Sequence, residues 1–300
     1  MMQTESFVYR HPIWIFYLLV FAISWGGILV VVGPGRVPGT PEEVNALYPY
    51  AILALLAGPS VSGVLMTWLM QGSTGLGTLV SRLVHWRVRP RWYAVALLTA
   101  PLAVLAALLP LSLISPVFLP AIVTTDDRFS LLIMGTAVGL VGGLLEELGW
   151  TGFAVPELLR RYRVLRTGLI VGVLWGTWHL LITYWISGDA TGTSSLAVFL
   201  PSLVASYGEL PAYRVIMVWV YDRTRSLLLA VLMHASLIFS TLFVLNSVTT
   251  GAPAVIWHVI LAVVLWIAVG VIAVANDGHL SQPLTPGPSF GPLGLKPRST

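Results

Sequence analysis

The sequence predicts an all-α fold, a polytopic membrane bundle of about eight transmembrane helices. Of the 300 residues, 57% are hydrophobic and only 9% are charged, and the mean hydropathy is +0.87. Soluble domains carry about 25% charged residues, so this composition indicates a chain that is largely embedded in lipid. A run of about 20 apolar residues is long enough to cross a bilayer as a helix. Eight runs approach or exceed that length, at residues 12–33, 48–70, 92–120, 130–153, 165–187, 196–221, 226–247 and 253–275.

The runs follow one another closely enough to predict one domain. The first run lacks the short apolar core and small-residue cleavage site of a signal peptide, so we expect a retained helix. The third run is longer than one crossing needs, and Pro101, Pro110 and Pro116 are its candidate break points. Residues 1–275 are therefore expected to form a single transmembrane domain. Residues 276–300 contain five prolines and no apolar periodicity, which predicts a flexible cytoplasmic tail.

Basic residues predict the orientation in the membrane. In the eight-helix arrangement, thirteen of the sixteen basic residues lie on one side, and Arg36, Arg128 and Arg214 are the exceptions. Cytoplasmic loops carry an excess of Lys and Arg. We therefore expect an integral protein of the cytoplasmic membrane with both termini in the cytoplasm.

Charge and cysteine content exclude several classes of function. The net charge is +4, but the arginines are spread over three loops at one membrane face. That distribution favours contacts with membrane lipids over a nucleic-acid partner. The chain has no cysteine, which excludes disulfides, cysteine-ligated zinc and thiol catalysis.

Two adjacent carboxylates, Glu146 and Glu147, interrupt the fourth apolar run. A charged side chain at the centre of a bilayer costs about 2.5–3.5 kcal/mol on insertion scales, so two in a row predict a functional site. Two other runs each contain one deep histidine, His179 and His234. At 1.5 Å per helical residue, Glu146 and both histidines lie about 14–21 Å from the arginine-rich rim. Acids and imidazoles at one depth are the ingredients of a hydrolytic site.

Glycines recur every fourth residue in two of the runs. They are Gly135, Gly139 and Gly143 in the fourth, and Gly168, Gly172 and Gly176 in the fifth. Such stripes let helix backbones approach closely. Extending the stripes by three or four residues reaches Glu146, Glu147 and His179, because residues at i+3 and i+4 share a helix face. We therefore expect the fourth and fifth helices to pack through their stripes and to carry the site at that surface.

Each polar residue also has a structural interpretation. A buried glutamate can be a hydrogen-bond anchor, and a single membrane histidine is more often an interhelical donor than a metal ligand. His258 follows Trp257 at the outer end of the eighth run, which is typical of an interface residue. His11, His85 and His279 lie at edges or in loops and are given no role.

Three motifs in order resemble those of the CPBP family, which includes the CAAX-type prenyl-protein endopeptidases and the bacteriocin-processing or immunity (Abi) proteins. They are EELGWTGF at residues 146–153, WGTWH at residues 175–179 and HASLI at residues 234–238. The family patterns are Glu-Glu-x-x-x-Arg, an aromatic residue followed four positions later by His, and His-x-x-x-Asn. The resemblance covers a family core of about residues 130–245.

Two positions depart from these patterns. Thr151 stands where the first motif has Arg, and Ile238 stands where the third has Asn. Arg214 lies about 12 Å inside the sixth run, and we expect it to replace the missing Arg by pairing with Glu147 or with Glu209. Thr241, at i+7 from the last motif histidine, is a weaker substitute for the Asn.

The resemblance implies a glutamate-dependent intramembrane endopeptidase with catalytic residues Glu146, His179 and His234. Glu146 would be the base that activates water. The two histidines would either bind zinc together with Glu146 or donate to the oxyanion without a metal. Glu147 would orient the site, and Trp150, Trp175, Arg214 and Thr241 would support it. The implied substrate is a peptide or protein, which in the eukaryotic relatives is prenylated.

Two alternatives remain open from the sequence. The two departures favour a catalytically impaired family member that acts in bacteriocin immunity or as a membrane scaffold. Buried Glu and His also occur in the proton relays of transporters and channels. A relay is expected to have polar residues along several helices, whereas these are expected to lie in one layer.

Overall fold

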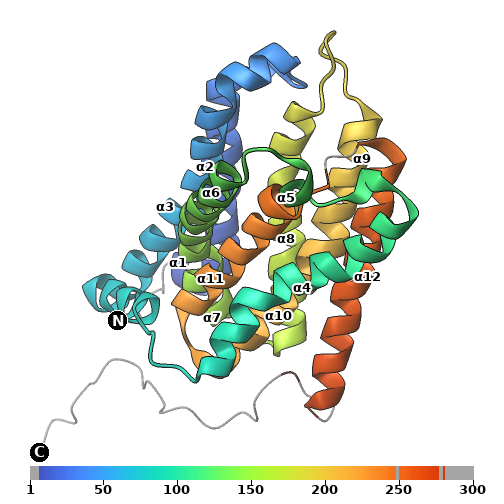
Figure 1. Cartoon of the computed structure of the whole chain (residues 1–300). Coiled ribbons are helices and arrows are strands. Elements are labelled where there is room, and N and C mark those ends of the chain that lie inside the picture. The colour runs from blue at the N-terminus through green and yellow to red at the C-terminus, as the bar shows by residue number, and fades with distance from the viewer. Residues whose placement is uncertain (1–6, 248–249, 277–279, 281–300) are drawn as a thin grey trace, which may run out of the picture.

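The computed structural model describes residues 7–247, 250–276 and 280, which form a bundle of packed helices (Figure 1). In that part of the chain the only β-type pairing is an isolated bridge between Gly188 and Ser194. The all-α fold and the membrane bundle predicted from the sequence are confirmed. The tail predicted at 276–300 lies outside the described residues except for Asn276 and Leu280.

Twelve α-helices occur in the described residues, joined by short turns. They are α1 (Phe7–Arg10), α2 (Pro12–Val32), α3 (Pro41–Leu83), α4 (Pro90–Ile114), α5 (Ala121–Thr124), α6 (Arg128–Gly149), α7 (Val155–Leu159), α8 (Val164–Ile186), α9 (Leu196–Val204), α10 (Leu210–Thr224), α11 (Leu227–Ile238) and α12 (Gly251–Ala275). Three π-helical segments interrupt or extend them: η3 (Trp150–Ala154), η4 (Ala205–Glu209) and η5 (Phe239–Val244).

Seven helices of the described chain are long and apolar enough to cross a membrane, one fewer than predicted. The difference is the predicted segment 196–221, which folds as α9, η4 and α10. This run is helical and lies antiparallel to α8, since Gly168 is close to Val215 and Gly176 to Ser206. It contains Glu209, Arg214 and Asp222, and these charged residues lower its hydropathy.

Local sequence explains where the long helices begin and end. Thr40 and Glu43 form a capping box at the start of α3, and Asp127 caps α6 by accepting a hydrogen bond from the Ser130 amide at 3.0 Å. Helix α3 is kinked at Gly72, which has φ +61°. Helix α4 continues through its two internal prolines and ends at Ile114, so the predicted third run stops well before residue 120.

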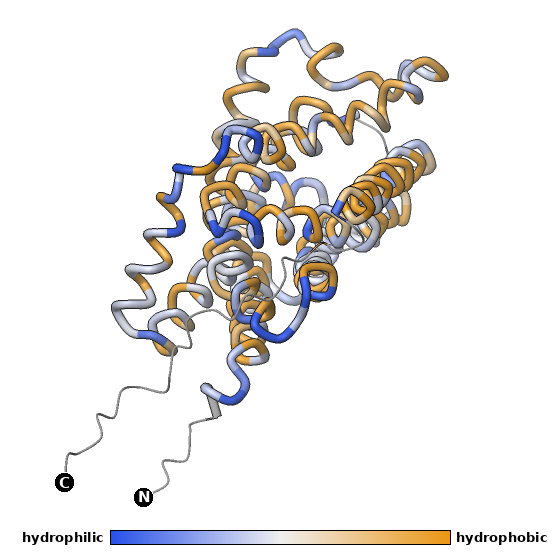
Figure 2. The backbone as a smooth tube through the Cα atoms, turned by 90° about the horizontal axis from the view of Figure 1, so that it is seen from below, coloured by the Kyte–Doolittle hydropathy of each residue, from blue (hydrophilic) through white to orange (hydrophobic). Residues whose placement is uncertain are grey.

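Lipid-facing surfaces of the helices are apolar, as expected for a membrane bundle. Trp14, Val30 and Leu113 are 76%, 86% and 89% exposed in the isolated chain. Figure 2 shows most helical turns in the colours of hydrophobic residues, with many of the hydrophilic residues in turns and at helix ends. A soluble protein would rarely expose so many large apolar side chains, and here they are expected to face hydrocarbon.

The glycine stripes do pack closely, but not against each other. A Cβ atom on Gly139 or Gly143 would lie 2.7–2.8 Å from backbone oxygens of α11. A Cβ atom on Gly172 would lie 2.5 Å from the Pro211 Cα in α10, and one on Gly176 would overlap the Ser206 oxygen in η4. The prediction that the fourth and fifth helices join through their stripes is therefore wrong. Stripe spacing indicates a close helix contact but does not identify the partner.

Substituting Gly139 with Ala is expected to lower the melting temperature of the purified protein. The new Cβ would lie 2.7 Å from the Ala235 carbonyl oxygen, and backbone cannot move aside cheaply. Overpacking of this kind costs about 1–3 kcal/mol, or about 2–12 °C for a chain of this size. Gly26→Ala is the matched control, because nothing lies within 4 Å of a Cβ at Gly26. Equal melting temperatures for the two variants would contradict the packing of α6 on α11.

Candidate active site

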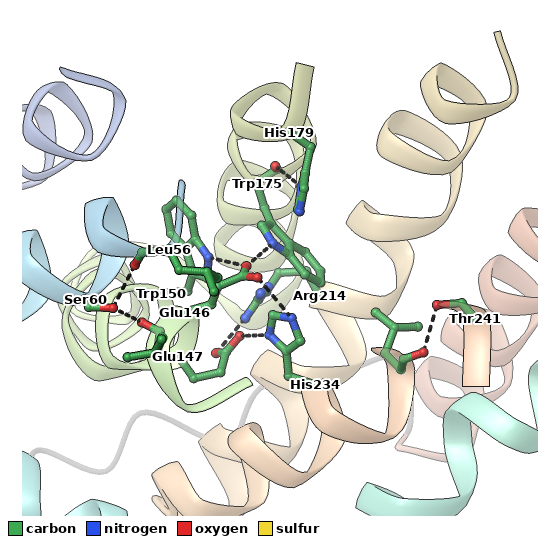
Figure 3. A network of polar contacts seen from close by, with 12 residues as sticks. Leu56, Ser60, Glu146, Glu147, Trp150, Trp175, His179, Arg214, His234 and Thr241 are labelled. Carbon is green, nitrogen blue, oxygen red and sulfur yellow. Dashed lines mark hydrogen bonds and ion pairs between the residues drawn. The ribbon is translucent and has the colours of Figure 1, made fainter. Parts of the chain in front are cut away.

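Four segments bring polar side chains together inside the bundle (Figure 3). The carboxylates Glu146 and Glu147 come from the end of α6, Trp175 from α8, Arg214 from α10 and His234 from α11. All five residues, called the polar cluster below, are nearly or fully buried, with exposures from 0% to 4%. Of the three residues predicted to lie at one depth, Glu146 and His234 therefore meet here, with Oε1 and Nε2 3.6 Å apart.

Glu147 is the more completely bonded carboxylate of the pair. Its Oε2 accepts hydrogen bonds from Arg214 Nη1 at 2.8 Å and from the Thr151 hydroxyl. Its Oε1 accepts from His234 Nδ1 at 2.7 Å. A buried carboxylate that accepts from three donors, one of them a guanidinium, is held in a fixed orientation.

Glu146 has only neutral donors on one of its oxygens. Its Oε2 accepts from the indole nitrogens of Trp175 at 2.7 Å and Trp150 at 3.2 Å. Its Oε1 lies 3.6 Å from His234 Nε2, which is close enough for attraction but longer than a hydrogen bond. Glu146 is therefore oriented by the protein and keeps one oxygen without a hydrogen bond to a described side chain.

Arg214 provides the positive charge of the cluster. Its side chain is fully buried, and the guanidinium lies 4.1 Å from the centroid of the Trp175 ring, over its face. Its Nε and Nη2 have no hydrogen-bond partner in the described structure. Of the two partners predicted for Arg214, the structure places it on Glu147. Glu209 pairs with His258 instead, at 2.7 Å.

His179 lies beside the cluster and is joined to it through Trp175. Its Nδ1 donates to the Trp175 carbonyl at 3.0 Å, while the Trp175 indole nitrogen donates to Glu146. The centroid of the Trp175 ring lies 5.9 Å from that of the His179 ring and 5.0 Å from that of the His234 ring. The indole therefore packs against both imidazoles. His179 is half-buried, whereas Glu146 and His234 are buried. His179 is therefore the most accessible of the three predicted catalytic residues.

One supporting assignment from the sequence needs correction. Thr241 does not reach the cluster, because its hydroxyl donates to the Leu237 carbonyl of the preceding turn at 2.8 Å (Figure 3). The i+7 spacing from His234 assumes 3.6 residues per turn, and the wider π-helical segment η5 changes that phase. His258 has the structural role predicted for a single membrane histidine, since its Nδ1 donates to Glu209 of another helical element at 2.7 Å.

Thr151 also belongs to the site, although the family patterns indicated only that it replaces an arginine. It lies at i+4 from Glu147 and donates to it, so Thr151 and Arg214 together occupy the place of the missing arginine. The i+4 spacing alone could have indicated this contact. The π-helical segment η3 begins at Trp150, three residues after Glu147. Such segments often mark functional positions within helices.

The predicted zinc ligands remain a prediction. Nδ1 of His179 and Nδ1 of His234 each donate a hydrogen bond to an oxygen. This leaves Nε2 of each ring available as a metal ligand, and imidazole nitrogen is a ligand that zinc prefers. However, no three His, Asp or Glu side chains of the described chain are arranged so that they could hold a metal ion. No step of the chemistry below is therefore assigned to zinc.

Comparison with known proteins identifies the segment that contains the cluster. Residues 128–239 match the family described as type II CAAX prenyl endopeptidase Rce1-like. The chain carries an Rce1-like family domain. This segment begins with α6 and ends with the first residue of η5, so it contains every residue of the polar cluster. The resemblance to the CPBP family predicted from the three motifs is confirmed.

A relative with a curated name supports the same assignment over a shorter stretch. Over 45 residues the chain is 33% identical to "CAAX prenyl protease 2" of Methanococcus maripaludis. The match covers 15% of this chain and 17% of that protein, so the chain matches about a sixth of its relative's length.

Proposed function

We propose that this protein is an intramembrane endopeptidase in which Glu146 activates water to hydrolyse a peptide bond. The observation that carries the proposal is the different bonding of the two carboxylates. Arg214 neutralises Glu147 at 2.8 Å, while Glu146 accepts only neutral indole N–H groups on Oε2. Glu146 is therefore the carboxylate that is free to accept a proton, and Glu147 is the one that positions its neighbours.

The proposed reaction uses Glu146 as a general base. A water bound at its Oε1 loses a proton to Glu146 while the water oxygen attacks the carbonyl carbon of the substrate. The same proton then passes from Glu146 to the leaving nitrogen as the C–N bond breaks. Base and acid catalysis by one positioned carboxylate typically contributes about 100- to 10,000-fold to the rate.

His234 is suited to stabilise the oxyanion formed in that attack. Glu147 accepts from Nδ1, which points Nε2 toward Glu146 Oε1. The proposed role requires that Nε2 of His234 also carries a proton. Its Nε2–H group can then donate to the developing negative charge. Glu147 and Arg214 act through His234 as positioning residues.

His179 is assigned a role in holding the water. Its Nδ1 donates to the Trp175 carbonyl, so Nε2 of the neutral ring carries a lone pair. A lone pair at this half-buried position can accept a hydrogen bond from the water before attack. The zinc ligands predicted from the sequence, Glu146, His179 and His234, are not arranged to hold an ion in the described residues, so zinc is given no part in this step. Elemental analysis of purified protein tests that set: an ion that is lost in both histidine variants supports it, and full activity without metal contradicts it.

The proposed substrate is a peptide or protein segment near the cytoplasmic membrane surface. Support comes from the Rce1-like match and from the relative named as a CAAX prenyl protease. Purified protein in vesicles should cleave a membrane-bound peptide, and a pair of otherwise identical peptides with and without a prenyl group tests the lipid requirement. Absence of cleavage across a peptide library, with folded protein, would favour the scaffold interpretation.

Both termini are proposed to be cytoplasmic, and the lack of cysteine makes this directly measurable. Arg161 lies in the turn between α7 and α8, and Asp189 lies in the loop after α8. Single-cysteine variants Arg161→Cys and Asp189→Cys are expected to react with a membrane-impermeant thiol reagent from opposite sides. In intact cells only Asp189→Cys should be labelled. Labelling of Arg161→Cys instead would reverse the orientation.

A further inference from the structure

Two adjoining cavities lie away from the Glu146 cluster, at the end of the bundle where α4 begins and α10 ends. The larger, of about 360 Å³, is lined by His85, Arg87, Arg89, Arg91, Trp92 and Arg223 among others. The smaller, of about 230 Å³, shares Arg91, Trp92 and Arg223 with it and adds Val95, Trp219 and Asn276. Neither cavity is lined by a residue of the polar cluster or by His179.

The larger cavity is strongly positive. Four arginines line it, at positions 87, 89, 91 and 223, and no carboxylate does. Within the described residues none of these arginines forms an ion pair. Arg223 donates through Nη2 to Asn276 at 3.2 Å, while its buried Nε has no partner. Several guanidinium groups with free N–H donors are a binding arrangement for phosphate.

The smaller cavity has an apolar part, formed by Trp92, Val95 and Trp219, beside Arg91, Arg223 and Asn276. The Trp92 and Trp219 rings meet edge to face with centroids 5.0 Å apart, and Val95 lies one helical turn after Trp92. Residues 92–95 belong to the first turns of α4, a membrane-spanning helix. We therefore expect the apolar part of this cavity to lie where the acyl chains of a lipid begin, next to arginines at the headgroup level.

We propose that the two cavities form one binding site for an acidic phospholipid of the membrane. The phosphate occupies the cavity of Arg87, Arg89, Arg91 and Arg223, and the upper part of an acyl chain lies against Trp92, Val95 and Trp219. The occupant is amphiphilic because the polar and apolar cavities share three residues. The site does not depend on the proposed protease activity, since it shares no residue with the catalytic cluster.

Native mass spectrometry of the full chain in detergent tests this site. We expect one phosphatidylglycerol to be retained per chain in preference to phosphatidylcholine. The double variant Arg91→Gln/Arg223→Gln should weaken phosphatidylglycerol binding about 30-fold, as expected for the loss of two interfacial arginine contacts. The matched control, Arg160→Gln/Arg161→Gln, removes the same charge from another loop and should change binding little. Melting temperatures establish that each variant is folded.

Two further measurements distinguish a lipid from a soluble phosphate. Val95→Trp fills the apolar cavity and keeps every arginine, so it should also weaken phosphatidylglycerol binding, and it decides the question if the arginine variant does not fold. Inorganic phosphate in large excess should not displace the lipid. The proposal is overturned if the two arginine pairs have equal effects, if phosphatidylcholine binds equally well, or if free phosphate displaces the lipid while Val95→Trp binds normally.

Discussion

Glu146→Gln is expected to lower peptide cleavage by at least about 100-fold, the loss typical of removing a general base. Glutamine keeps the shape of the side chain and can still accept from Trp150 and Trp175 through its amide oxygen. It cannot take a proton from water at neutral pH. The measurement is the initial rate of cleavage by purified protein in vesicles, normalised to the amount of folded protein.

Glu209→Gln is the matched control for this substitution. Glu209 is a second buried carboxylate of the bundle, 4% exposed, and it pairs with His258 outside the cluster. The control and His258→Ala should retain cleavage. A similar loss in Glu209→Gln would mean that any buried carboxylate affects the rate through folding.

Histidine substitutions should reproduce the loss without adding to it. His179→Ala and His234→Ala are each expected to be as damaging as Glu146→Gln, because groups that act as one unit fail together. Combining His234→Ala with Glu146→Gln should therefore reduce the rate no further than either change alone. Additive losses would contradict a shared role in one chemical step.

Arg214→Ala is expected to be the most destabilising single substitution in the cluster. It would leave Glu147 fully buried without its positive partner, at a cost of about 3–5 kcal/mol. For a chain of this size that corresponds to a fall in melting temperature of about 6–20 °C. Arg36→Ala is the control, because its ion pair with Glu43 at 3.4 Å is largely exposed and should contribute about 0–1 kcal/mol.

A double variant separates loss of the ion pair from loss of packing. If the cost of Arg214→Ala comes from the stranded charge, adding Glu147→Gln should recover part of the melting temperature. The guanidinium also packs on the Trp175 ring at 4.1 Å, and this contribution should not be recovered. Equal melting temperatures for Arg214→Ala and Arg36→Ala would contradict the buried pair.

Much of the cluster could be predicted from the sequence, because helix geometry converts spacing into depth. Glu146, His179 and His234 lie on three apolar runs at similar distances from the arginine-rich rim, and the structure brings two of them to 3.6 Å. The pairing of Arg214 followed from the cost of a lone charge in the bundle. These predictions depended on periodicity and on the desolvation of charge, both of which are local properties of the sequence.

Other features depend on which helices become neighbours and could not be predicted in that way. The stripe of α6 packs on α11 and that of α8 on α10, although their spacing is the same. Thr241 is carried away from the cluster by a π-helical segment, which no residue pattern in 239–244 indicated. The hydrogen bond between His258 and Glu209 joins α12 to η4, two elements far apart in the chain.

The central claim, that Glu146 is the base and Glu147 the positioning carboxylate, is tested most directly by comparing Glu146→Gln with Glu147→Gln. For each variant, the cleavage rate per folded molecule and the melting temperature are measured in the same preparation. We predict that Glu146→Gln melts close to the unmodified protein and loses at least about 100-fold in rate. Glu147→Gln should melt lower and lose less rate per folded molecule. A folded Glu146→Gln that cleaves at the unmodified rate would contradict the account.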